Sequence, residues 1–280
     1  MNKNSAEGLW NKTYDAEMSA VFIIRNKFQQ IQNYVKDLYE CGVELFTLDK
    51  QEEFEVTETL RIAAILLKRC LTDFRVLWNL LLTGYTPQAG SIAASLFETA
   101  LSIPYLLKNR EAIQDIKNNN GDIPWKVPDL CKNIASIQYK SDKYQYELGW
   151  REIYAAYKWL CKIKHPTLRS TLHEGLSTSI RENEFVVMAI PDIRQEDLAV
   201  KMTILTISIS RLCDAVFCIH NELKLDKDNE RYKKWLEKIN AVPPNVGKIY
   251  KKITKIIDLP FTIGDEKISR DYKQLRKNKS

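Results

Sequence analysis

Apolar residues recur at helical spacing along almost the whole of this 280-residue chain, and only nine glycines and nine prolines interrupt the pattern. Steps of three and four residues place side chains on one face of a helix, and such faces become stable by packing against one another. We therefore predict an all-α protein, a multi-helix bundle of long antiparallel helices. The predicted helices cover approximately residues 9–46 (one helix or two in tandem), 54–82, 86–109, a short segment to 117, 129–137, 145–164, a long segment to 223, 229–239 and 246–257.

Local signals refine these boundaries. Thr86 is expected to cap the third helix with Pro87 in its first turn, and Asp192 or Asp197 to cap the long helix that ends near residue 223. Two short β-prone runs flank a polar turn in residues 176–190, which predicts one small β-hairpin. The dipeptide at 243–244 predicts a break between the last two helices, because proline cannot donate a helical hydrogen bond.

The positive charge of the chain is concentrated near its C-terminus. Residues 224–280 contain sixteen Lys and Arg against eight Asp and Glu, although the net charge of the whole chain is only +6. We therefore divide the chain into a helical-bundle core domain, residues 1–223, and a basic helical C-terminal appendage, residues 224–280. Such asymmetry indicates either a solvated tail or an arm that binds nucleic acid or a partner protein. The expected nucleic-acid contacts are Lys164, Lys248, Lys251, Lys252 and Lys255; the apolar face of the last helix could instead dock on the core.

Composition excludes several classes of protein. An apolar fraction of 45% with 10% aromatic residues is too high for a disordered chain, and no apolar run reaches the length of a transmembrane helix. The N-terminus lacks the apolar centre of a signal peptide, so a cytoplasmic protein with six free thiols is expected. Phosphate-binding loops, dinucleotide fingerprints, nucleophile elbows and a complete metal-ligand set are not recognisable, so we expect no cofactor and no metal.

The first candidate site centres on Glu98, an acid among small and apolar residues of a predicted helix. A buried carboxylate is costly unless it is paired, so we expect Glu98 to be buried and hydrogen-bonded. Tyr157 and His165 are its expected neighbours. The three residues would form either an acid–base site or a structural hydrogen-bond network.

The second candidate site is the short polar segment that contains Lys164, His165, Arg169 and His173. A histidine could exchange protons while the cations bind a phosphodiester, with no metal required. The alternative is a solvated connector. His220 ends a long helix, where the helix dipole favours an imidazolium, so it is expected to cap the helix rather than to bind a ligand.

Two sequence elements resemble a known family. Residues 80–89, LLLTGYTPQA, with residues 95–98, SLFE, resemble the first element of a prokaryotic all-helical family of unknown function; Tyr157, Leu160 and His165-Pro166 match its second element. The resemblance covers roughly residues 55–220. Ala94 stands where the family pattern usually has arginine, and Cys161 where it usually has serine. If that arginine neutralises the glutamate in relatives, Glu98 must here find another partner or have a raised pKa. That family is similar in turn to the HEPN helical ribonucleases and abortive-infection proteins, whose Arg and His spacing this chain does not reproduce.

Two functional hypotheses follow. The first is a cytoplasmic interaction or sensing module of prokaryotic antiviral defence, which binds RNA or a partner protein through its basic C-terminal arm. The alternative is a HEPN-like, metal-independent ribonuclease of a defence or toxin system, with His165 or His173 as the acid–base and Arg169 and Lys164 as phosphate binders. Whether the protein is an enzyme and whether it forms a homo-oligomer stay open.

Overall fold

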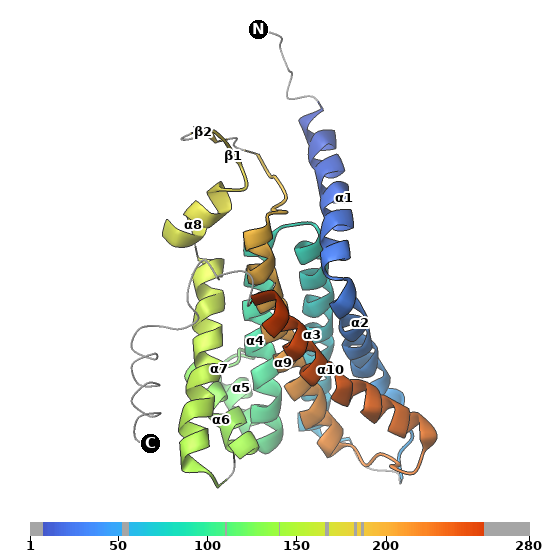
Figure 1. Ribbon diagram of the computed structural model, residues 1–280. Coiled ribbons are helices and arrows are strands. Elements are labelled where there is room, and N and C mark those ends of the chain that lie inside the picture. The colour runs from blue at the N-terminus through green and yellow to red at the C-terminus, as the bar shows by residue number, and fades with distance from the viewer. Residues whose placement is uncertain are drawn as a thin grey trace.

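The computed structural model describes residues 8–51, 56–109, 111–139, 141–165, 168–181, 184–185 and 188–254, without the side chains at 168–170, 180–181 and 184–185. Within these residues the chain is an all-α helical bundle, as predicted (Figure 1). Its elements are α1 (Leu9–Lys27), α2 (Gln29–Glu44), the 3₁₀ turn η1 (Leu45–Thr47), α3 (Glu58–Leu82), α4 (Thr86–Lys108), α5 (Ala112–Asn118), α6 (Val127–Tyr139), α7 (Lys143–Lys164), α8 (Leu168–Gly175), β1 (Ser179–Arg181), β2 (Glu184–Phe185), α9 (Gln195–Glu222) and α10 (Glu230–Thr254).

Helices α4 and α9 lie at the centre of the bundle. Helix α4 packs on α3, α9, α7 and α6, and its small residues allow this close packing. A Cβ added at Gly90, for example, would lie 2.6 Å from Ile163 Cγ2 of α7. By length and composition both α4 and α9 could also cross a membrane, but 67% and 61% of the relevant windows are buried inside the bundle. The core helix of a helical bundle commonly has this length and this apolar composition.

The first predicted helix is two helices in tandem, one of the two arrangements expected. They meet at Phe28, which is buried and stacks on Trp78 of α3 with 6.1 Å between ring centroids. The packing of this aromatic residue fixes the point at which the chain changes direction. Only Ala20 and Ile24 of α1 are buried, so most of α1 contributes little to the core.

The predicted break at residues 243–244 is wrong, because α10 continues through both prolines to Thr254. The two rings are exposed, while Trp235, Val242 and Val246 are buried against α2 and α9. Burial of this face stabilises a helix that has lost two backbone donors. The apolar face of α10 therefore docks on the protein's own core. The division of the chain at residue 223 stays a prediction.

In the described residues of the region of the expected hairpin, 176–181, 184–185 and 188–190, the chain forms two short paired segments. Strand β1 pairs antiparallel with β2 through Ser179 with Phe185 and Arg181 with Glu184, and the register is irregular. Together β1 and β2 contain five residues, which is too few to support the hairpin that was expected over 176–190. The expectation of free cysteines is confirmed for all six thiols.

Candidate functional site

A buried polar cluster lies where α8 and the segment before α9 meet the starts of α4 and α9. Its central residue is Asp197, in the first turn of α9, whose side chain is completely buried. Thr86 Oγ1 donates a hydrogen bond of 2.5 Å to Asp197 Oδ2, and His173 Nε2 lies 2.9 Å from Asp197 Oδ1. Lys201 Nζ, one helical turn further along α9, forms an ion pair with the same carboxylate. Asp197 therefore joins α4, α8 and α9.

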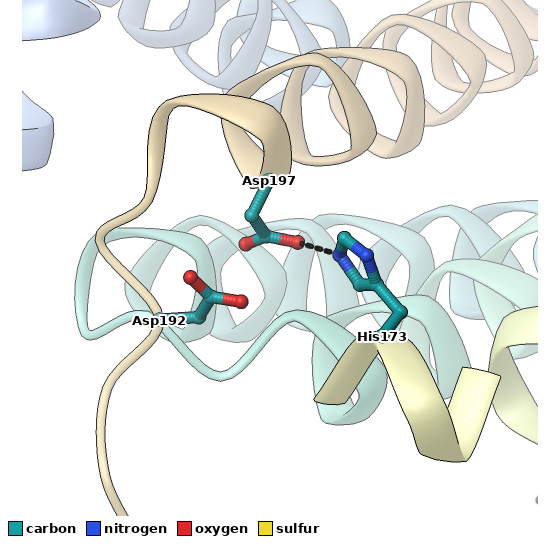
Figure 2. Close-up of side chains that lie close together, drawn as sticks. All are labelled: His173, Asp192 and Asp197. Carbon is teal, nitrogen blue, oxygen red and sulfur yellow. Dashed lines mark hydrogen bonds and ion pairs between the residues drawn. The ribbon is translucent and has the colours of Figure 1, made fainter. Parts of the chain in front are cut away.

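A second carboxylate, Asp192, extends the cluster. Arg194 Nε lies 3.0 Å from Asp192 Oδ1, and the same guanidinium donates a 2.8 Å hydrogen bond to the backbone oxygen of His173. Lys201 Nζ also donates to the backbone oxygen of Asp192 at 2.7 Å. Figure 2 shows the side chains of His173, Asp192 and Asp197 directed toward one another. The two acids are matched by two cationic side chains from the same short stretch of chain.

The turn between α3 and α4 is shaped to receive this segment. Gly84 has a φ of +83°, which favours glycine, and its backbone oxygen accepts a 3.0 Å hydrogen bond from Asp192 N. A Cβ on Gly84 would lie 2.8 Å from Pro191 Cβ and 2.9 Å from Asp192 N. The next residue, Tyr85, donates a 2.5 Å hydrogen bond to Glu17 of α1. The turn in the motif-like stretch 80–89 thus holds α1 on one side and the cluster on the other.

The surroundings of Asp197 keep it ionised. Burial alone would raise its pKa, but the hydrogen bond with His173, the charge and hydrogen bond of Lys201 and the hydroxyl of Thr86 together hold the pKa below its ordinary value. Burial likewise acts to lower the pKa of Arg194, and the hydrogen bonds and charge of Asp192 raise it above its usual range. Both ion pairs are therefore stable charged pairs at neutral pH.

The cluster has the donor types of a metal site but does not fit a metal ion. His173, Asp192 and Asp197 offer one ligand atom each within 4.8 Å of one another. Each carboxylate, however, is already bound by a cationic side chain, Arg194 or Lys201. A divalent cation would have to displace or approach these two positive charges, which opposes binding.

A small cavity adjoins the cluster. Its volume is about 40 Å³, and its lining includes Gly84, His173 and Asp197 together with the apolar side chains of Ile163 and Val200. This volume holds on the order of three water molecules. It is too small for a nucleotide or another substrate of that size.

The first predicted site is assembled in part. Tyr157 Oη of α7 donates a 2.6 Å hydrogen bond to Glu98 Oε1 of α4, so the expected pairing of Glu98 is present. Glu98 is half-buried rather than sealed in the core. Burial, followed by the hydrogen bonds with Glu98 and Cys161, raises the pKa of Tyr157. His165, the residue that caps the end of α7, is exposed and is not the partner of Glu98.

Among the described side chains of the second predicted site, only His173 lines the cavity. His173 belongs to the buried cluster, whereas Lys164 and His165 are exposed at the end of α7 and do not line the cavity beside His173. Arg169 lies on α8, but its side chain is outside the described part of the structure, as is Lys255. The ring of His220 stacks on Trp235 at 5.1 Å between ring centroids, and burial lowers its pKa despite the nearby helix end, so the imidazolium that the dipole favours is opposed by burial.

Sequence reasoning missed the centre of the cluster. The sequence predicts Asp192 or Asp197 as the cap of α9, but the N-cap of this helix is Arg194. The hydroxyl of Thr86 was assigned to its own helix and instead binds Asp197. One signal was available: Asp197 and Lys201 are four residues apart in an otherwise apolar run, which is the spacing of an ion pair on one helix face.

No protein-family model, no curated protein and no solved structure matches this chain. The resemblance to the prokaryotic helical family therefore rests on the motif residues alone.

Proposed function

We propose that this protein is a helical interaction module that binds single-stranded RNA through lysines near the C-terminal end of α10. The observation that supports this function is a groove of about 220 Å³ between the junction of α1 with α2, the start of α9 and the last turns of α10. Two lysines, four residues with side-chain amides and five apolar residues line this groove. These residues are Lys27, Lys252, Asn26, Gln29, Gln30, Gln195, Phe28, Ile31, Leu198, Ile249 and Ile253.

The chemistry of this groove suits a nucleic-acid strand. Lysines bind phosphates as point charges, and side-chain amides donate and accept hydrogen bonds at base and sugar edges. Lys248 and Lys251 extend the positive surface along the exposed side of α10, and neither forms an ion pair with a described residue. The opposite face of α10 is fixed in the core, so these charges are held on a rigid element.

The alternative, a metal-independent ribonuclease, receives less support. His165 or His173 would be its acid–base, but His165 lies exposed at the end of α7, away from the cavity, while Nε2 of His173 is engaged by Asp197 and the cavity beside it holds only a few waters. We therefore propose the binding function. The setting, cytoplasmic antiviral defence in a prokaryote, is proposed from the composition and the motif resemblance.

Fluorescence anisotropy with a labelled single-stranded RNA tests the proposal on the full chain. Each phosphate contact on a single strand contributes about 0.7 to the slope of log K against log salt, so K251Q/K252Q should lower that slope by about 1.4. The matched control is K68Q/K143Q, which removes the same charge from exposed sites on α3 and α7 and should leave the slope unchanged.

Three outcomes would contradict the proposal. Wild-type protein that binds no RNA at low salt lacks the function. Equal losses in K251Q/K252Q and in the control would mean that only the overall charge matters. Cleavage of the RNA in excess EDTA that disappears in H165A or in H173A would support the ribonuclease alternative in its place.

A further inference from the structure

Helix α1 carries a row of large apolar side chains that no described residue covers. Trp10, Tyr14, Met18 and Phe22 follow one another at four-residue steps and are 85%, 59%, 53% and 70% exposed. In Figure 1 the N-terminal part of α1 extends past the end of α3, away from the rest of the bundle. Monomeric proteins rarely expose a contiguous apolar surface of this kind without a partner for it.

We infer that this row is the interface of a homodimer, in which α1 of one copy packs against α1 of a second copy in antiparallel orientation. A row of residues four apart forms a ridge, and such ridges interdigitate in the commonest class of helix packing. A twofold axis between Tyr14 and Met18 brings Tyr14 of each copy against Met18 of the other. The same symmetry directs Trp10 of each copy toward Phe22 of the other.

The area of the row is sufficient for this interface. Aromatic side chains cover roughly 200 Å² each, so Trp10, Tyr14 and Phe22 at their exposed fractions supply roughly 430 Å² per copy. Met18 at its exposed fraction adds roughly 100 Å², so the total is roughly 530 Å² per copy, or about 1,100 Å² for the dimer, which exceeds the roughly 1,000 Å² expected of a biological interface. The surface is rich in aromatic residues, as the centres of such interfaces are.

The charges of α1 favour a second copy over a lipid surface. Helices that lie on membranes carry many Lys and Arg on their polar face. Helix α1 has the cations Lys12, Arg25 and Lys27 but also the acids Asp15 and Glu17. Glu17 is bound to Tyr85 of the bundle, which holds the middle of α1 in place for a partner.

Analytical ultracentrifugation of RNA-free protein tests the dimer. Wild-type protein should be dimeric at about 100 µM, and W10K and F22E should each weaken association by about 100-fold or more, because an aromatic anchor is lost from both copies. The matched control is I65K, which places the same charge at an exposed apolar site near the start of α3. It should leave association unchanged.

The double variant W10K/F22E tests the orientation. In the antiparallel dimer each new lysine faces a new glutamate of the other copy, so the double variant should associate more strongly than either single variant. Circular dichroism confirms that every variant is folded. A monomeric wild-type protein, or full association of W10K and F22E, would overturn the inference. A monomer that co-sediments with phosphatidylglycerol vesicles would assign the row to a membrane instead.

Discussion

Replacement of Asp197 by asparagine removes the negative charge at the centre of the buried cluster. Lys201, whose side chain is 1% exposed, would then keep its positive charge with only neutral acceptors as partners, the asparagine side-chain oxygen and the backbone oxygen of Asp192. Breaking a buried ion pair by removing one partner costs about 3–5 kcal/mol. Urea unfolding at pH 7, followed by circular dichroism, should therefore show D197N destabilised by that amount.

Two further variants separate the buried charge from other effects of the substitution. The control is E58Q, which breaks an ion pair with Lys117 in which both side chains are 54% exposed, and it should cost less than about 1 kcal/mol. In D197N/K201M neither charge remains, so most of the lost stability should return. A loss below about 1 kcal/mol in D197N would refute the reasoning. So would a double variant no more stable than D197N.

The acid sensitivity of the protein gives an independent check. The pKa of Asp197 in the folded protein lies below its ordinary value of 3.8, so the unfolded chain takes up this proton first as the pH falls. The stability contributed by the ionised carboxylate is therefore complete well above pH 3.8 and is lost as the pH falls through the folded-state pKa. The difference in unfolding free energy between wild type and D197N should shrink from pH 7 to pH 3. A constant difference would contradict the assignment.

Three other variants test further features of the fold by the same urea assay. G84A should cost about 1–3 kcal/mol because of the positive φ and the approach of Pro191, whereas G247A, in an open position of α10, should stabilise by about 0.5–1 kcal/mol; equal effects would contradict the role of the turn. Burial lowers the pKa of His220, so the unfolded chain takes up this proton first, and stability should fall as the pH drops through about 6.5. H220F retains an aromatic ring beside Trp235 and should remove that pH dependence; an unchanged pH profile would show that other groups cause it.

The all-α fold could be predicted because helical spacing is a local property that recurs in every long segment. The same local reasoning failed at Pro243 and Pro244. Their missing donors are visible in the sequence, but the burial of Val242 and Val246 against other helices is not. Tertiary packing thus overrides a strong local signal in α10.

The candidate site shows the same limit. Glu98 is a lone acid in an apolar helix, a pattern that predicts a hydrogen-bonded partner, and Tyr157 is that partner. Asp197 fits that pattern better, but its position near a helix start made it resemble a cap. Its link to His173 also depends on the path of the intervening chain, which spacing along a helix does not encode.

The proposed RNA groove and the proposed dimer interface both include residues of α1. Lys27, the last residue of α1, lines the proposed RNA groove and donates a 3.3 Å hydrogen bond to the backbone oxygen of Ile193, next to the buried cluster. The exposed row lies on the same helix, so a dimer through α1 would relate two grooves by a twofold axis. One RNA strand long enough to reach both grooves would then bind with the gain of an intramolecular second contact, whereas a strand that fills a single groove would not. Dimerisation would in this way make the protein selective for longer RNA without any base-specific contact.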